Sequence, residues 1–165
     1  MPKDKLQLKS FPMEELGLLV KEFTACGKEV VISAKGISMK PLLREGKDRN
    51  VLAPCNTENF RVGDVVLYTR RNGSYVIHRI VGINEDKTFN LMGDYQTLVE
   101  RGINADQIVA RADGFMRLNH EFSLNSPLYR IYVKAWGGHS VFRRVYIFFS
   151  HKWSSLKRKL GLKKR

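Results

Sequence analysis

Apolar positions in the first part of the chain change their spacing at Gly27. Before this glycine, four of them follow helical spacing: Leu16, Leu19, Val20 and Phe23. This predicts one helix within residues 11–27, with Pro12 near its start and Gly27 at its end. The β-branched run KEVVISA (28–34) then predicts a strand. Residues 1–10 are polar, and we expect no regular structure there.

The middle of the chain alternates between apolar and polar positions, which is the pattern of β-strands. Two alternating runs within residues 64–83 flank Asn72-Gly73, the strongest short signal for a β-hairpin. Two later runs, FNLMGD (89–94) and QIVARADGFMRL (107–118), predict further strands. Several short strands with few helical stretches favour a mainly β, antiparallel and partly closed structure.

The character of the chain changes at Ser126, where it becomes aromatic and basic. Beyond Gly137-Gly138, apolar residues advance in steps of three or four and form one stripe of a helix: Phe142, Val145, Phe149, Trp153, Leu156 and Leu160. Basic residues fill most of the other positions. We therefore divide the chain into a helical arm (1–27), a β-rich domain (28–125) and a basic, aromatic helical tail (126–165).

The charge balance points to an anionic partner. The chain has 29 Lys and Arg residues against 16 Asp and Glu residues, a formal net charge of +13. Because the basic residues gather on an aromatic amphipathic segment without a nucleic-acid motif, we expect residues 140–165 to associate with an anionic membrane. We expect no nucleic-acid partner. The alternative is that the apolar stripe packs on the β domain and the charges are simply solvated.

Cysteine spacing and hydropathy exclude several classes of protein. Cys26 and Cys55 lie 29 positions apart, without a CxxC spacing or a nearby histidine, so we expect reduced thiols and neither a metal nor a cofactor. A disulfide between them stays open. No apolar run is long enough for a signal-peptide core or a spanning helix. We expect a cytoplasmic protein, or one peripheral on the cytoplasmic face of the membrane.

Ser38, in the stretch KGISMKPLL (35–43), is the first candidate for chemistry. A serine in this setting either caps a turn or acts as a nucleophile, and a nucleophilic serine needs a base to remove its proton. Three of the four histidines lie in a polar turn or in the tail, where a solvated or membrane-facing role is expected: His120, His139 and His151. His78 instead lies inside the predicted hairpin strand YVIHRIVGI (75–83), on the face of Val76 and Ile80.

A base of this kind must itself be oriented by a third group, usually a carboxylate. Two acidic residues follow at suitable positions. Asp94 ends the next predicted strand, and Glu100 lies in the loop after it. The sequence leaves open which of the two orients His78.

These segments together resemble a known superfamily. GISMKP looks like the G-x-S-M-x-P box of type I signal peptidases, which are related to self-cleaving repressors of the LexA type. VGDVVLY, YVIHRIVGI and LMGD resemble the later boxes, in the same order. The resemblance covers residues 28–117. It implies the signal-peptidase and LexA type of β fold and a serine endopeptidase that acts on a leader or propeptide segment, bound by β-strand addition.

The resemblance also implies roles for individual residues. Ser38 matches the nucleophile, and His78 matches the base of the endoplasmic-reticulum type of signal peptidase, where bacterial enzymes mostly have lysine. Asp94 matches the aspartate of the G-D box. Glu100, before Arg101-Gly102, stands where the family usually has aspartate.

The residues around the serine match the family as well. Gly36 takes a position where other members carry an oxyanion-stabilising hydroxyl, so backbone N–H groups, that of Ser38 among them, are expected to replace it. Met39 and Pro41 are candidates for lining the substrate site and fixing the turn. Packing and the start of a helix are equally good interpretations of these two residues.

Two other functions are open at this stage. A self-cleaving regulator of the LexA type needs an N-terminal DNA-binding domain, and the roughly 35 residues before the serine box are too few for a helix-turn-helix. A non-catalytic protein that binds anionic membrane is the other alternative. The family's usual N-terminal membrane anchor has no counterpart here, and the basic tail is a possible substitute.

Overall fold

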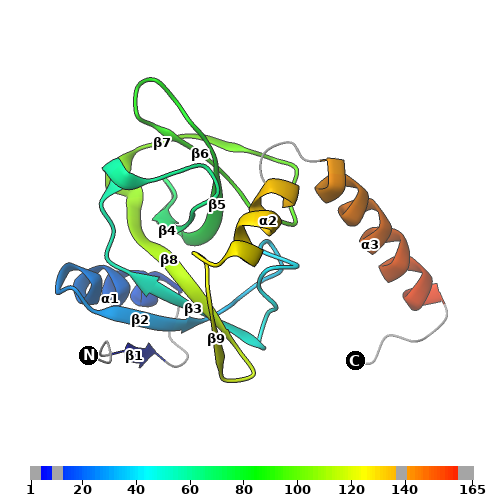
Figure 1. Ribbon diagram of the computed structural model, residues 1–165, viewed down its shortest axis with the longest axis horizontal. Coiled ribbons are helices and arrows are strands. Elements are labelled where there is room, and N and C mark those ends of the chain that lie inside the picture. Colours follow the sequence, from blue (N-terminus) through cyan, green and yellow to red (C-terminus); the bar gives the residue numbers. More distant parts are fainter. Residues whose placement is uncertain (1–4, 9–12, 137–140, 160–165) are drawn as a thin grey trace.

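The computed structural model of the chain describes residues 5–8, 13–136 and 141–159 (Figure 1). The described residues form nine strands: β1 (Lys5–Leu8), β2 (Glu29–Ser33), β3 (Asp48–Ala53), β4 (Val65–Thr69), β5 (Tyr75–Ile83), β6 (Phe89–Met92), β7 (Glu100–Ile103), β8 (Ile108–Arg117) and β9 (His120–Ser123). They also form three α-helices: α1 (Met13–Ala25), α2 (Pro127–Trp136) and α3 (Val141–Lys159). Several residues used above lie outside the described part: Pro12, Gly137, Gly138, His139 and Leu160, together with the side chains of His151 and Leu156.

The elements with clear periodicity are confirmed. The predicted N-terminal helix is α1, the run KEVVISA contains β2, and Asn72-Gly73 joins β4 to β5 in a hairpin. The two later predicted strands are β6 and β8, and the predicted C-terminal helix is α3. The expectation of no regular structure in residues 1–10 is wrong for β1, which pairs parallel to β2. The remaining strands, β3, β7 and β9, were not anticipated. Helix α2 lies within the predicted helical tail, although only the later stripe was assigned to a particular helix.

The strands form one sheet in the order β1-β2-β3-β8-β4-β5-β6-β7, and β9 pairs with β8 outside this path. Every pairing is antiparallel except β1 with β2. The mainly β, antiparallel architecture is therefore confirmed. The sheet is not closed: β1 and β7 end the order. Four of the pairings contain a register shift, and such bulges bend and twist the strands, so the sheet curls without closing (Figure 1).

Each face of the sheet carries its own apolar cluster, and alternation along the strands sorts side chains between them. In β4, Val65 and Leu67 join the larger cluster, whereas Val66 and Tyr68 join the smaller one. In β5, Ile77 packs toward the larger cluster and Ile80 belongs to the smaller. Helix α1 covers the larger cluster through two buried residues, Leu16 and Val20.

Candidate active site

Ser38 lies in the irregular segment 34–47, which connects β2 to β3. Its neighbour Met39 is buried in the larger cluster, as is Leu43, and the Leu43 N–H donates a hydrogen bond to the Met39 carbonyl at 2.9 Å. Gly36 has a φ of +74°, a conformation that side chains with a Cβ rarely adopt. The two buried side chains anchor the segment, and the glycine lets the chain turn just before the serine.

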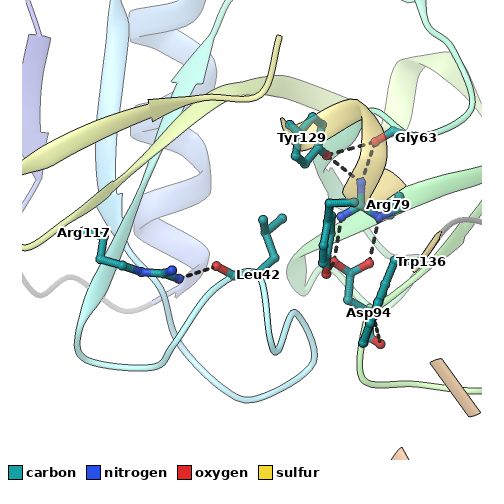
Figure 2. Close-up of polar contacts among 8 residues, drawn as sticks. Leu42, Gly63, Arg79, Asp94, Arg117, Tyr129 and Trp136 are labelled. Carbon is teal, nitrogen blue, oxygen red and sulfur yellow. Dashed lines mark hydrogen bonds and ion pairs between the residues drawn. The ribbon is translucent and has the colours of Figure 1, made fainter. Parts of the chain in front are cut away.

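A buried carboxylate fixes the end of this segment. Asp48 accepts hydrogen bonds from the guanidinium groups of Arg44 and Arg117, and its side chain has no exposed surface. Burial alone raises the pKa of Asp48, but the bonds from Arg117 and Arg44 outweigh it and hold the pKa well below its usual range. Arg117 also donates to the Leu42 carbonyl at 2.9 Å (Figure 2). The turn that carries Ser38 is thus held to β8.

The carbonyl of Ser38 joins the turn after β6. It accepts a hydrogen bond from the Tyr95 N–H at 2.7 Å. A Cβ placed on Gly93 would lie 2.6 Å from the same oxygen, so only glycine fits there. Arg79 pairs with Met92 across β5 and β6, and antiparallel register therefore brings Gly93 to the level of His78. The structure thus places the predicted nucleophile and the predicted base on neighbouring segments.

A pocket of about 300 Å³ opens beside Ser38. One wall is formed by the end of β2 and the start of the serine segment. The first residues of β5 form the opposite wall. Of the residues predicted to contact substrate, Gly36 and Met39 line it, whereas Pro41 does not. Asn50 of β3 also lines the pocket. This side chain is buried, and its Nδ2 has no hydrogen-bond partner among the described residues.

His78 is fully buried in β5, on the face of the smaller cluster, as predicted from alternation with Ile80. Its Nδ1 lies 3.3 Å from Glu100 Oε1 and 3.1 Å from the Tyr68 hydroxyl. Its Nε2 is buried without a hydrogen-bond partner among the described residues. Of the two nitrogens, only Nε2 is therefore available to accept a proton from another group.

The neighbours of Nδ1 determine the tautomer of His78. A carboxylate only accepts hydrogen bonds, and Glu100 Oε1 lies 3.3 Å from Nδ1, so a proton on Nδ1 is favoured over a lone pair there. The Tyr68 oxygen then accepts a hydrogen bond from His78 Nδ1–H, and the Glu100 carboxylate lies beside that proton. We assign the neutral imidazole with its proton on Nδ1, which leaves the Nε2 lone pair free, as a general base requires.

Glu100 is held in its charged form by two partners. Burial raises the pKa of this carboxyl, but the hydrogen bonds from Arg70 and Tyr68 outweigh that effect and keep the pKa below its usual value. Arg70, just after β4, binds both carboxylate oxygens through Nε and Nη2. Burial dominates at His78 itself and lowers its pKa to about 4, although the Glu100 charge acts in the opposite direction. His78 is thus neutral near pH 7 and can accept a proton.

Asp94 has a different partner from the one that its position in the sequence suggested. No hydrogen bond or ion pair joins it to His78; its two oxygens bind Arg79 Nε and Nη2 at 2.7 and 2.6 Å. Both side chains are completely buried. Of the two acids left open by the sequence, the geometry places Glu100 against His78.

Helix α2 surrounds this ion pair with aromatic side chains, as Figure 2 shows for Tyr129 and Trp136. Arg79 Nη1 donates to the Gly63 carbonyl at 2.7 Å, and the Tyr129 hydroxyl donates to the same carbonyl at 3.1 Å. Tyr132 donates to Asp94 Oδ2 at 2.7 Å, and Trp136 Nε1 donates to the Asp94 carbonyl at 3.1 Å. All three guanidinium nitrogens of Arg79 and both carboxylate oxygens of Asp94 are thus hydrogen-bonded. Through its bonds to Asp94, α2 also fixes the turn that holds the Ser38 carbonyl.

Sequence reasoning did not identify Tyr68, Arg70 or Asn50. The hairpin register contained a signal for Tyr68, because Asn72-Gly73 sets Tyr68 opposite Val76 and hence on the face of His78. Arg70 lies 30 residues from Glu100 in sequence, and nothing in its neighbourhood indicates the pairing. Asn50 lies in a strand that was not predicted.

The described residues contain no group of three or more His, Cys, Asp or Glu side chains that could hold a metal ion. Cys26 and Cys55 are both free thiols. Neither a scan against protein-family models nor a search of curated proteins gives a match to this chain. What the site does must therefore be argued from its geometry.

The buried ion pair generates a test of stability. Changing Arg79→Met leaves the Asp94 charge buried without its partner, and we expect the free energy of unfolding to fall by about 3–5 kcal/mol. Adding Asp94→Asn removes that charge, so the double variant should lose less than the sum of the two single changes. Urea denaturation of the three variants measures both effects.

A surface ion pair supplies the control. Arg111 and Asp113 are 2.9 Å apart but partly exposed, so Arg111→Met should cost less than about 1 kcal/mol. Equal losses for Arg79→Met and Arg111→Met would contradict the importance of the buried pair.

Proposed function

We propose that this protein is a serine endopeptidase related to the endoplasmic-reticulum type of signal peptidase, with Ser38 as nucleophile and His78 as general base. The observation that carries the proposal is the state of His78: its Nδ1 faces Glu100 and Tyr68, while its buried Nε2 has no partner among the described residues. A neutral histidine oriented by a carboxylate, on a segment beside the one that carries a serine, supports activation of that hydroxyl.

The proposed reaction runs through an acyl-enzyme. Ser38 Oγ attacks the carbonyl carbon of the scissile bond while its proton passes to His78 Nε2. The C–N bond then breaks, and Nε2 returns that proton to the leaving amine. Water then attacks the acyl carbonyl carbon while its proton passes to Nε2. The bond to Ser38 Oγ breaks, Nε2 returns the proton to Oγ, and the carboxylic acid is released. Glu100 stabilises the imidazolium that forms in each half of the reaction.

The Ser38 hydroxyl makes no hydrogen bond to His78 in this structure. Such bonds are often long or misaligned in free enzymes and form only when substrate binds. The serine segment is well anchored at Met39, at Leu43 and at the Ser38 carbonyl. We therefore expect a side-chain rotation of Ser38, rather than a movement of the backbone, to bring Oγ to Nε2.

The pocket supports an extended peptide as substrate. Residues 75–77 of β5 pair with β4, but pairing with β6 begins only at Arg79. Ser33 pairs with β3, whereas the pairing of β2 with β1 ends at Ile32. Among the described residues, neither strand end has a partner on this edge, and both line the pocket. A peptide backbone can add to such an edge.

Asn50 adds polarity to an otherwise largely apolar pocket. It shares the wall with Ile32, Leu43 and Ile77, and its amide has no protein partner among the described residues. Burying an amide without a hydrogen bond costs about 1–3 kcal/mol, which a substrate group that bonds to it would recover. We infer that the pocket accepts a substrate side chain with a hydrogen-bond acceptor in preference to an apolar side chain of the same size.

The assignment of the nucleophile and base is tested with a fluorophosphonate probe, which phosphonylates activated serines with loss of fluoride. We expect the probe to label Ser38, as mapped by mass spectrometry, and expect Ser38→Ala and His78→Ala each to abolish labelling. Ser33→Ala and His120→Ala are matched controls, since Ser33 lines the same pocket and His120 is exposed. Unchanged labelling in Ser38→Ala, with the protein folded, would refute the proposal.

The pKa of His78 generates a prediction about pH. Below its pKa the imidazole is protonated and cannot act as base, so the rate of labelling should fall with a midpoint near pH 4, not near the ordinary value of about 6.5. The Glu100 charge raises this pKa, so Glu100→Gln should move the midpoint lower still. It should also slow the reaction, by roughly 10³- to 10⁴-fold. A midpoint at or above pH 6.5 would contradict burial as the dominant effect.

The role of Asn50 is tested with the variant Asn50→Leu and a peptide library. At each position of the library, one peptide carries threonine and its matched partner carries valine. The wild-type protein should prefer threonine over valine at one position by roughly tenfold, and the variant should lose that preference. Because the amide has no partner, the variant should unfold at the same or a higher urea concentration. A preference that survives in Asn50→Leu would exclude this role for Asn50.

A further inference from the structure

Helix α3 presents two different faces. One face is attached to the rest of the protein: Arg143 is buried, Tyr146 packs against the rings of Tyr95 and Trp136, and the Ser150 hydroxyl lies 2.7 Å from the Tyr95 hydroxyl. These positions are spaced by three and four residues, so they form one stripe along the helix. Figure 1 shows α3 at the outer edge of the molecule, beyond α2.

The opposite face of α3 is apolar and exposed. Six large side chains lie on it with between 46% and 71% of their surface accessible: Val141, Phe142, Val145, Phe148, Phe149 and Trp153. We call this set the outer face of α3. The alternative that the apolar stripe packs on the β domain is therefore wrong for its described members, Phe142, Val145, Phe149 and Trp153. A different set of residues attaches the helix.

An apolar surface of this kind is unusual for a protein that meets only water. Contiguous exposed patches of several large apolar side chains mark sites of association with a partner. Three of the six side chains are phenylalanine, and one is tryptophan, whose ring prefers the boundary between lipid and water. The composition of the outer face fits the headgroup and upper acyl region of a bilayer.

The charges beside this face identify the kind of bilayer. No Asp or Glu follows Glu121, whereas Lys and Arg continue to the end of the chain. Arg144 and Lys152 are exposed on α3, and Lys152 Nζ lies 4.6 Å from the centre of the Phe148 ring. Each Lys or Arg near an anionic membrane contributes about 1 kcal/mol of attraction. Burial of the apolar side chains and attraction of the basic residues thus both favour binding to an anionic bilayer.

We propose that the outer face of α3 binds the surface of an anionic lipid bilayer, with the helix lying in the plane of the headgroups. The apolar side chains enter the interface, and the basic residues beside them contact lipid phosphates. Among the described residues no helix is both long and apolar enough to cross a membrane. The proposal does not depend on the peptidase activity.

This binding would position the whole β domain and not only a tethered helix. The inner face of α3 contacts Tyr95, whose N–H holds the Ser38 carbonyl, and Trp136, which binds the Asp94 carbonyl. Ile147 of the same helix lines a second pocket together with Arg70 and Glu100. The candidate site would therefore be held at a fixed distance from the lipid surface.

Co-sedimentation of the full chain with vesicles tests the proposal. We expect binding to vesicles of phosphatidylcholine mixed with phosphatidylglycerol, weaker binding to phosphatidylcholine alone, and a decrease as salt is raised. The double variant Phe149→Ala/Trp153→Ala should bind the anionic vesicles at least tenfold more weakly, because it removes two large apolar groups that the bilayer would bury. Its unfolding midpoint should be unchanged, since both side chains are exposed in the free protein.

Leu118→Ala is the control, because Leu118 is an apolar residue even more exposed than Phe149 and Trp153, at the β8–β9 turn and far from α3 in sequence. It should bind the vesicles like the wild type. Equal weakening by Leu118→Ala, or no binding of the wild type to anionic vesicles, would overturn the proposal. A gel-shift assay with duplex DNA gives the competing outcome: DNA binding that depends on Phe149 and Trp153, without vesicle binding, would assign the face to nucleic acid.

Discussion

The ion pair between Arg79 and Asp94 joins the parts of the molecule on which the candidate site depends. Arg79 follows His78 in β5, and Asp94 lies in the turn whose backbone holds the Ser38 carbonyl. Without each other, two completely buried charges would be strongly destabilising, so each segment is held where the other requires it. Helix α2 completes the bonding through three aromatic side chains, Tyr129, Tyr132 and Trp136. The geometry around Ser38 thus depends on an ion pair that has no hydrogen bond to His78.

The two acidic residues of the site, Asp94 and Glu100, have different surroundings. Asp94 is fully enclosed and bonded to a cation, and so supports the scaffold. Glu100 is partly exposed, is kept charged by Arg70 and faces a neutral histidine. Burial of His78 disfavours its charged form, while the nearby carboxylate favours it, and burial is the stronger effect. This balance leaves His78 neutral in the resting state, with a carboxylate placed to stabilise its protonated form.

Periodicity in the sequence was enough to predict the helices and strands whose apolar pattern repeats clearly. The helix stripe of Leu16 and Val20, the Asn72-Gly73 hairpin and the aromatic stripe of α3 could each be predicted, because each pattern extends over several turns or a whole strand pair. Strands β3, β7 and β9 are short or carry mixed polarity, and β1 has only four residues. Their pairing is decided by long-range neighbours, which local pattern does not contain.

The sequence by itself determined the candidate residues, the hairpin face on which His78 lies and the amphipathic character of the C-terminal helix. It did not determine the partners. Asp94 and Glu100 were equivalent candidates along the chain, and only the fold places one against Arg79 and the other against His78. Likewise, the stripe of α3 was visible, but its exposure was decided by Arg143, Tyr146 and Ser150, which attach the opposite face. Periodicity reports which side chains share a surface, whereas contacts between distant segments decide what that surface meets.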